Sequence, residues 1–234
     1  MTLERLDIHT CEDRLQVALH RARYDFALEQ LRPSDAVLEI GTGLGVFTEE
    51  ICRKCASYTG VEYEEASWRA TVERTRANVI RGDARRLPFP DNQFSYIVCL
   101  EVLEHLGDWR AGVAELHRCL RPDGRAVVSV PWRRRGGKSA INEYHLYEPG
   151  EHELRGAFEA LFGEVKVLYQ YFPETRWMTL ARTLRLRRLA GLAGRYKALA
   201  DGLPSATGEL RIGPVGRGMK SGLILVPAKK KVCG

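Results

Sequence analysis

The feature that most constrains this 234-residue chain is a glycine-rich turn that follows a short apolar run. The run at residues 36–40 ends in Gly41-Thr-Gly-Leu-Gly45, and residues 46–57 then resume the apolar spacing of a helix. Glycine tolerates the positive φ angles of a tight turn and lets a ligand approach the backbone closely. The pattern predicts a strand, a turn and a helix in that order, with either a nucleotide site or a bare structural turn at the glycines.

Apolar runs and helical segments alternate along most of the chain. Runs that predict strands lie at residues 36–40, 58–62, 79–82, 94–100, 125–130, 164–172 and 221–226. Segments with helical spacing lie at residues 11–31, 46–57, 64–78, 109–120 and 151–161. This alternation predicts an α/β fold in which helices cover both faces of a largely parallel sheet.

Residues 173–220 separate the last two expected strands and are too many for a bare loop in a compact domain. We interpret them as a helical insertion, with a basic helix at residues 177–199. Such a helix either packs on the domain with a solvated basic face or contacts a membrane surface or nucleic acid.

Positive charge is concentrated at the C-terminal end. The whole chain carries a formal net charge of +6, whereas residues 173–234 hold 13 Lys and Arg against 3 Asp and Glu, a net +10. Residues 1–172 therefore carry −4. An anionic partner would be met at the C-terminal quarter of the chain.

Cysteine usage and apolar content argue against several classes of protein. The six cysteines are scattered, unlike those of a small disulfide-rich domain, and we expect reduced thiols. Cys52 and Cys55 form a C-x-x-C pair that no nearby His or second pair completes, so we expect no metal site. The first residues have no targeting pattern and no apolar run is long enough to span a membrane, so we expect a cytoplasmic protein.

A carboxylate at the end of the second expected strand adds to the nucleotide hypothesis. Glu62 lies about twenty residues beyond the turn, where a carboxylate can accept hydrogen bonds from both hydroxyls of an adenosine ribose. NAD and S-adenosylmethionine both carry that ribose, so Glu62 alone does not separate them. The G-x-G-x-G spacing of the turn differs from the G-x-G-x-x-G that dinucleotide pyrophosphate sites prefer.

Two further segments carry a resemblance to a known family. Gly82-Asp-Ala84 follows the third expected strand, and Leu87-Pro-Phe-Pro-Asp-Asn-Gln-Phe-Ser-Tyr-Ile-Val-Cys-Leu-Glu-Val-Leu-Glu-His-Leu106 runs through the fourth. With the glycine turn, they resemble the class I S-adenosylmethionine-dependent methyltransferases of the small-molecule group that includes quinone-biosynthesis enzymes (methyltransferase type 11). The resemblance extends over residues 18–172, and residues 223–230 look like the family's last strand.

The resemblance implies a Rossmann-like class I methyltransferase fold. Its seven-stranded, mostly parallel sheet would have helices on both faces and a helical insertion before the last strand. The cofactor would be S-adenosylmethionine and the product S-adenosylhomocysteine. The expected parts are an N-terminal helical lid segment, the cofactor-binding core, the basic insertion as a substrate cap, and the last strand with a basic tail, at residues 1–32, 33–172, 173–220 and 221–234.

The resemblance also implies cofactor contacts. The glycine turn would face the methionine moiety, Glu62 would bind the ribose, and the chain around Tyr63 and Asp83 would contact the adenine. The helix before the turn resembles one that closes over the cofactor in relatives, which makes Tyr24 a lid contact. The full implied set is Tyr24, Glu39, Gly41, Thr42, Gly43, Gly45, Glu62, Tyr63, Asp83, Ala84, Leu100 and Glu101.

Two histidines are candidates for proton transfer. Methyl transfer is an in-line displacement that depends mainly on alignment, and it needs a base only where the nucleophile carries a proton of high pKa. His105 follows the fourth expected strand and His145 the fifth, and imidazole suits a general base near neutral pH. A helix cap explains His105 as well as catalysis does, whereas for His145 the family pattern favours a structural role at the opening of the helix at 151–161.

The expected acceptor is a small molecule with an oxygen nucleophile, such as a sugar, a lipid-linked compound or a natural product. The chain reads Leu100-Glu-Val-Leu where enzymes that methylate amino groups of nucleic acids carry an Asn/Asp-Pro-Pro-Tyr-like motif. Arg133-Arg-Arg135 either recognise an anionic group on the acceptor or form a solvated loop. Peripheral membrane contact through the basic insertion stays open, and nothing indicates an oligomeric state.

Two other classes of function stay open. One is a methyltransferase for RNA or another macromolecule that uses the basic C-terminal region, and the other is a cofactor-binding module without catalysis. An NAD dehydrogenase fits less well, because residues 82–84 and 101–105 have no role in it.

Overall fold

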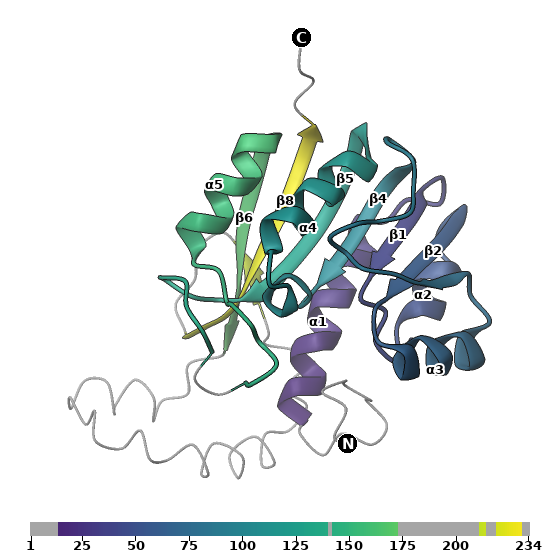
Figure 1. Ribbon diagram of the computed structural model, residues 1–234, viewed down its shortest axis with the longest axis horizontal. Helices are drawn as coiled ribbons and strands as arrows, with labels where there is room; N and C mark the ends of the chain where they lie inside the picture. Colours follow the sequence, from purple (N-terminus) through teal and green to yellow (C-terminus); the bar gives the residue numbers. More distant parts are fainter. Residues whose placement is uncertain (1–13, 140–141, 173–210, 214–218, 231–234) are drawn as a thin grey trace.

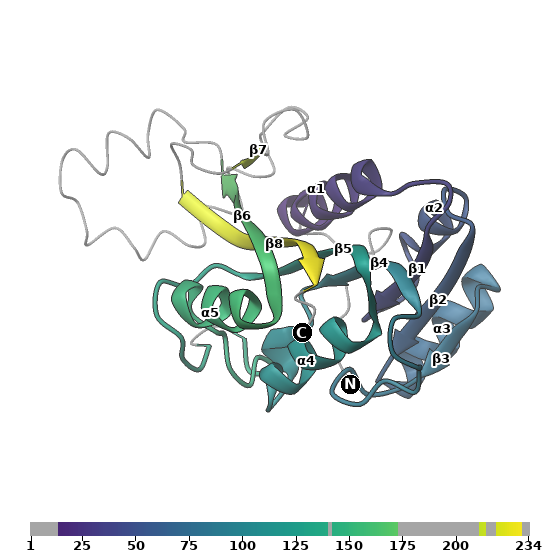
Figure 2. The same ribbon diagram turned by 90° about the horizontal axis from the view of Figure 1, so that it is seen from above.

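The computed structural model describes residues 14–139, 142–172, 211–213 and 219–230. Its strands form one eight-stranded sheet in the order β3-β2-β1-β4-β5-β8-β6-β7. Figure 1 labels the strands from β2 to β6 in this order, and Figure 2 also labels β3 and β7. The strands are β1 (Ala36–Ile40), β2 (Ser57–Glu62), β3 (Val79–Arg81), β4 (Phe94–Leu100), β5 (Leu120–Pro131), β6 (Phe162–Phe172), β7 (Arg211–Gly213) and β8 (Met219–Lys230). The helices are α1 (Arg14–Gln30), α2 (Thr48–Cys52), α3 (Glu65–Thr75), the 3-10 helix η1 (Leu103–His105), α4 (Trp109–Cys119) and α5 (Glu151–Leu161).

The order in which the chain adds strands to the sheet changes direction between β1 and β4. Strands β3, β2, β1, β4 and β5 pair in parallel, whereas β8 runs antiparallel to both β5 and β6. The chain leaves β1 on one side of the sheet and β4 on the other, so the carboxyl ends of these strands open at a topological switch point, where open α/β sheets bind ligands. The expected class I fold is confirmed.

Helices cover both faces of the sheet, as Figure 2 shows. On one face, α4 and α5 pack their apolar residues, such as Val113 and Phe158, against β4, β5 and β8. On the other face, α1 and α2 contribute Ala27 and Ile51 to a second core with the opposite side chains of β1 and β4. Alternate residues of each central strand therefore serve different cores, which accounts for their nearly continuous apolar sequence.

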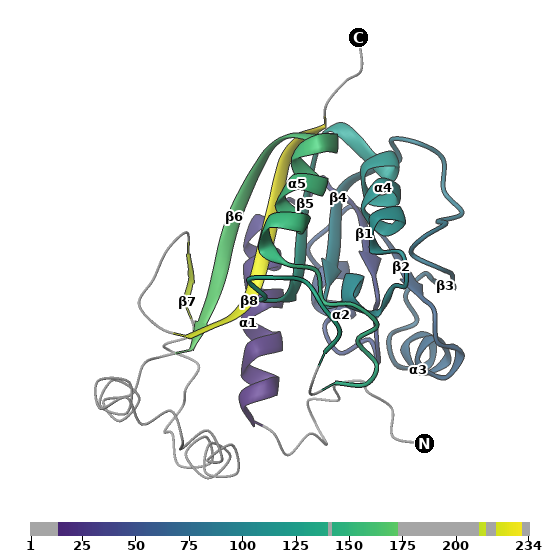
Figure 3. The same ribbon diagram turned by 60° about the vertical axis from the view of Figure 1, so that its left-hand side comes forward.

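The short strand β7 is an addition to the seven strands that were expected. It lies at the sheet edge beyond β6, where Ile212 pairs with Gln170 (Figure 3). The expectation of a helical insertion over residues 173–220 is thus wrong at residues 211–213 and 219–220, where strands pair with β6. The reason is that the open edge of β6 offers backbone partners to any chain that returns beside it. The basic helix expected at 177–199 lies outside the described residues.

The other expected elements differ in their bounds. The helix at 151–161 is confirmed residue for residue as α5. The helix after the glycine turn is shorter than expected, because α2 ends at Cys52 and a turn follows. None of the helices in the part of the chain that the structure describes is long and apolar enough to cross a membrane.

Candidate functional site

The three glycines of the turn after β1 differ in what surrounds them. Gly41, Gly43 and Gly45 have φ angles of 77°, 57° and 70°, in the left-handed region that favours glycine. A Cβ on Gly41 would lie 2.4 Å from Cγ2 of Val102, and one on Gly45 would lie 2.7 Å from Cγ2 of Thr71. A Cβ on Gly43 would meet no atom within 4 Å. Packing therefore requires two of the glycines, whereas Gly43 borders open space on the ligand side.

The carboxylate of Glu62 joins the glycine turn to the end of β2. Glu62 is buried, its Oε2 accepts from the Gly43 N–H at 2.8 Å, and its Oε1 accepts from the Glu64 N–H at 3.0 Å. An ionised carboxylate only accepts hydrogen bonds, which suits the hydroxyls of a ribose. The structure thus fixes Glu62 at the place where the sequence predicted a ribose contact.

A hollow of about 490 Å³ opens next to Glu62. It is lined by Tyr63, Glu64, Glu65, Arg81, Gly82 and Asp83. Tyr63 is 66% exposed although it is a large aromatic residue, and its ring is available for a planar ligand to stack on.

Asp83 lies at the lip of this hollow as an ionised acceptor. The Arg85 guanidinium pairs with it at 2.6 Å, and this hydrogen bond lowers the pKa of Asp83. An ionised carboxylate is an acceptor only, which suits the exocyclic amine of adenine. Ala84 is buried directly behind it.

Glu39 lies within β1 and forms a buried polar cluster. Its Oε1 accepts from the Tyr24 hydroxyl at 2.8 Å, and its Oε2 accepts from Thr48 at 3.0 Å and from the Tyr58 hydroxyl. Burial raises the pKa of Glu39, and the three hydroxyl donors oppose that rise. Tyr24 also stacks on Phe47, with ring centroids 4.1 Å apart. The structure places Tyr24 in the core beneath the turn, and its lid contact with the cofactor stays a prediction.

The carboxyl end of β4 turns sharply at Glu101. This residue has a φ of 56°, its Oε1 accepts from Ser129 at 2.8 Å, and its Oε2 lies 3.3 Å from the guanidinium of Arg23 on α1. The preceding Leu100 is buried. Across the edge, the buried Thr42 hydroxyl has no hydrogen-bond partner among the described residues. The edge between β1 and β4 therefore holds polar groups oriented from both strands.

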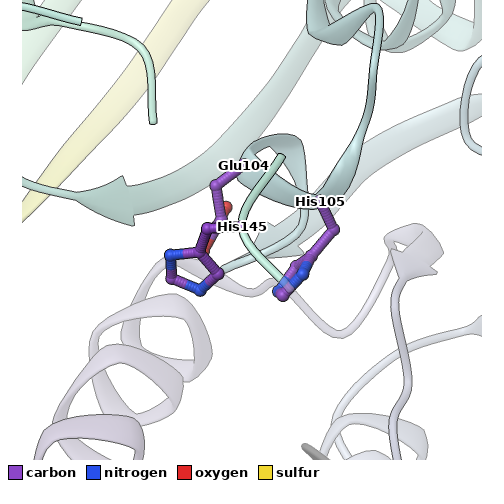
Figure 4. A group of neighbouring side chains, drawn as sticks. All are labelled: Glu104, His105 and His145. Carbon is purple, nitrogen blue, oxygen red and sulfur yellow. The ribbon is translucent and has the colours of Figure 1, made fainter. Parts of the chain in front are cut away.

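The two candidate catalytic histidines lie side by side. His105 belongs to η1, and His145 lies in the loop between β5 and α5, yet their ring centroids are 4.8 Å apart at an interplanar angle of 86° (Figure 4). Nδ1 of His105 lies 3.2 Å from the carbonyl of Tyr144, and Nδ1 of His145 lies 2.7 Å from the Glu148 carboxylate. The structure thus brings together two residues that the sequence separates by forty positions.

Comparisons with known proteins agree with this geometry. Residues 38–128 match the model of the methyltransferase domain family. The chain is 35% identical over 138 residues to a probable S-adenosylmethionine-dependent methyltransferase of Mycolicibacterium smegmatis, which covers 56% of this chain and 52% of that protein. It is 28% identical over 177 residues to a demethylmenaquinone methyltransferase of Deinococcus radiodurans, 71% of each chain. The fold is similar to that of a Thermotoga maritima S-adenosylmethionine-dependent methyltransferase, with a TM-score of 0.63, 19% identity and 93% of each chain covered.

Residues 38–128 form a class I S-adenosylmethionine-dependent methyltransferase domain. The chain spans about half the length of the first curated relatives that it matches. The matched range runs from β1 through most of β5, so it contains the glycine turn, Glu62, the hollow beside Glu62 and His105.

In this methyltransferase domain the cofactor candidates follow one edge of the sheet. The hollow at Tyr63 suits the adenosine, Glu62 the ribose, and the open side of Gly43 the methionine moiety. S-adenosylmethionine is the cofactor of this family, as the resemblance implied. The individual contacts of the implied residues remain predictions.

Sequence reasoning missed Glu104, which lies between the cofactor edge and the histidines. It is fully buried, and neither carboxylate oxygen has a hydrogen-bond partner on another described residue. Burial and the nearby charge of Glu101 raise the pKa of Glu104 well above its ordinary range. The available signal was a carboxylate directly before His105, just after a strand that ends at the ligand edge.

The arginines after β5 do not form a single charged patch. Arg133 forms an ion pair with the buried carboxylate of Glu148, so its charge is already neutralised within the domain. Burial alone would raise the pKa of Glu148, but hydrogen bonds from His145, Ser139 and Arg133 outweigh it and lower the pKa. Arg134 and Arg135 are exposed. The Arg133 guanidinium thus holds the carboxylate that orients His145, and recognition of an acceptor anion by these arginines stays a prediction.

Proposed function

We propose that this chain transfers the methyl group of S-adenosylmethionine to an oxygen atom of a small-molecule acceptor. The observation that carries the proposal is the convergence of His105 and His145 beside Glu104, at the sheet edge that also bears the glycine turn. This edge is where class I domains bind ligands, and imidazoles placed there can act on an acidic proton of the acceptor.

The chemistry needs alignment and the removal of one proton. The acceptor oxygen attacks the sulfonium methyl carbon in line, an O–C bond forms, and the S–C bond breaks to leave neutral S-adenosylhomocysteine. The hydroxyl proton must leave as the bond forms. An imidazole with its proton on Nδ1 has its lone pair on Nε2, and the carbonyl and carboxylate that face Nδ1 of His105 and His145 favour that tautomer.

Two considerations support a small acceptor. Several relatives of about 30% identity are named demethylmenaquinone methyltransferases, a name that specifies a small molecule and not a nucleic acid. The basic region that an RNA substrate would use, residues 173–234, lies outside the matched methyltransferase domain. A sugar, lipid-linked or natural-product hydroxyl is the acceptor class that we propose.

The test is a transfer assay with methyl-labelled cofactor and the full chain. The panel contains phenols and hydroquinones, sugars, a lipid-linked hydroxyl compound and an RNA transcript, and cofactor affinity is measured separately by calorimetry. We expect label in a hydroxyl compound, and a loss of about 100-fold or more in kcat for the His105→Ala/His145→Ala double variant. His152→Ala is the matched control, because His152 is exposed on α5.

Three outcomes would contradict the proposal. Label in RNA alone would favour a macromolecular substrate that the basic C-terminal region binds. Tight cofactor binding without transfer to any acceptor would favour a non-catalytic module. Wild-type turnover in the double variant would show that neither imidazole handles the proton.

A further inference from the structure

Three potential metal ligands gather where η1 meets the loop before α5. Glu104 and His105 come from η1 and His145 from the loop, and one donor atom from each lies within 4.8 Å of the others (Figure 4). Two imidazole nitrogens and one carboxylate oxygen form a ligand set that Zn²⁺ and other divalent transition metals accept, with open positions left for water or substrate.

The carboxylate of Glu104 lacks a partner. It is 0% exposed, and no hydrogen-bond donor from another described residue reaches either oxygen. The positive charge of Arg23 favours the ionised form of Glu104, but the ion pair that this guanidinium forms is with Glu101, whose Oε2 lies 3.3 Å from its Nη1. Buried carboxylates are normally paired, hydrogen-bonded or bound to a metal, so the position of Glu104 points to a cation that completes the site.

Both histidines are oriented in the way that metal-binding histidines usually are. The Glu148 carboxylate lies 2.7 Å from Nδ1 of His145, and the Tyr144 carbonyl lies 3.2 Å from Nδ1 of His105. Each acceptor draws the ring proton to Nδ1 and leaves Nε2 as the nitrogen able to bind a metal. A carboxylate or carbonyl behind the imidazole also fixes the ring orientation and makes it a stronger ligand.

The backbone holds the two segments together around the site. The Tyr147 N–H donates to the carbonyl of Glu104 at 3.2 Å, and Gly137 and Glu148 exchange backbone hydrogen bonds of 3.0 and 2.9 Å. Metal–ligand bonds of about 2.0–2.2 Å put neighbouring ligand atoms about 3–3.6 Å apart. Side-chain rotations that move the donor atoms by about an ångström would therefore bring them to metal-binding distance, without a change in the backbone.

We propose that Glu104, His105 and His145 bind one divalent transition-metal ion. This assignment departs from the expectation from the sequence that the chain has no metal site. An acceptor oxygen could bind at an open position of the ion, which would lower the pKa of its hydroxyl so that solvent takes the proton. The two imidazoles would then act as ligands of the ion and not as free general bases. The acceptor role deepens the proposed function and rests on it, whereas the binding of the ion rests on the three side chains alone.

The test measures metal binding directly with the full chain. Protein is stripped with a chelator, exchanged into clean buffer and titrated by calorimetry with Zn²⁺ and with Mn²⁺. Mn²⁺ is included because thiolates bind it poorly, and burial raises the pKa of Cys52 to about 11, so the C-x-x-C thiols should not compete. We expect one equivalent per chain, and loss of that site in Glu104→Gln and in His145→Ala.

Glu148→Gln tests the orientation of His145 without removing a ligand. We expect it to weaken metal binding by about 10- to 100-fold, as loss of a carboxylate behind a ligating histidine does. His152→Ala and Glu164→Gln are matched controls, because both side chains are exposed and neither belongs to the cluster. Circular dichroism of each variant checks that it is folded.

Metal binding and the proposed function fail in different ways. Equal metal affinity in the wild type, Glu104→Gln and His145→Ala would overturn the metal site, whereas full methyl transfer by the chelator-treated enzyme would overturn only the role of the ion in binding the acceptor. One equivalent of metal bound through the three residues, with intact cofactor binding but no transfer to any hydroxyl acceptor, would leave the metal site standing and reject the proposed function.

Discussion

The three glycines of the turn have different roles at the level of single residues. Gly41→Ala adds a Cβ 2.4 Å from Val102 at a positive φ, whereas Gly43→Ala meets only open space. We expect Gly43→Ala to cost about 1–2 kcal/mol of stability through its left-handed backbone, and Gly41→Ala to cost more. In contrast, Gly43→Ala should lose cofactor affinity at least tenfold, because its methyl group projects into the ligand side.

Chemical denaturation and calorimetry with S-adenosylhomocysteine separate the two effects. The informative quantity is the affinity of Gly43→Ala at a temperature where the variant is fully folded. Wild-type affinity in that variant would show that the cofactor does not approach the turn at Gly43.

Protonation of His20 should make the stability of the protein depend on pH, which the sequence did not indicate. Burial lowers the pKa of His20 to about 4, repulsion from Arg23 adds to this, and Glu101 opposes it. Because the folded-state pKa lies below the unfolded value of about 6.5, the unfolded chain takes up a proton that the folded chain does not. Stability is therefore full above about pH 6.5 and is lost as the pH falls toward 4.

We expect His20→Gln to reduce the loss of unfolding free energy between pH 7 and pH 5 by about 2 kcal/mol. Urea denaturation at the two pH values measures the difference, with His152→Gln as the exposed control. Identical pH dependence in His20→Gln and wild type would mean that another group carries the titration.

At the scale of elements, Asp35 joins the segment after α1 to strands β4 and β5. Its carboxylate is buried and accepts from the Ser95 hydroxyl of β4, from the Arg32 N–H, and from Arg125 of β5 at 2.7 Å. Removing one partner of a buried ion pair leaves the other charge uncompensated. Asp35→Asn should therefore cost about 3 kcal/mol of unfolding free energy.

Cofactor affinity should be unchanged in Asp35→Asn, because Asp35 precedes β1 and the glycine turn follows it. Asp91→Asn is the control, since Asp91 pairs with Arg118 while 69% exposed and should cost less than about 1 kcal/mol. Equal losses in the two variants would show that the Asp35 contacts do not tie the elements together.

The sequence predicted the bounds of an element well where contacts between residues close in sequence determine them. Helix α5 was predicted to the residue because Glu153 accepts from the Gly150 N–H at its first turn, a contact within four residues. Strand β5 begins at Leu120, earlier than expected, because Leu120 pairs with Phe94 and an irregularity takes up the residues before Arg125. That pairing joins distant segments and leaves no periodic signal in the sequence.

The residues of the candidate site also fall into those that local sequence predicts and those that depend on long-range contacts. The glycine turn and Glu62 could be predicted, since strand–turn–helix geometry dictates their positions. The contact of His105 with His145 could not, because it depends on a loop that is anchored through backbone bonds to η1. The burial of Glu104 likewise depends on helices and strands far from it in sequence.

At the scale of the whole molecule, cofactor binding should be coupled to the stability of the sheet. The glycine turn and the hollow beside Glu62 follow strands β1, β2 and β3, so a bound ligand contacts only the folded arrangement. A ligand at 100 times its Kd stabilises the folded state by about 2.7 kcal/mol. For a chain of this size that corresponds to a rise of about 5–10 °C in Tm.

We expect S-adenosylhomocysteine to produce this shift and NAD to produce none, as measured by thermal denaturation. Tyr63→Ala should lose much of the shift with little change in the Tm of the free protein, because its ring is 66% exposed and meets ligand more than core. Tyr144→Ala is the matched control, an aromatic that is 47% exposed at the histidine edge and should keep the full shift. An equal shift with NAD would reject the cofactor assignment, whereas an undiminished shift in Tyr63→Ala would reject only the adenine contact. The two outcomes separate the identity of the cofactor from its placement along the sheet edge.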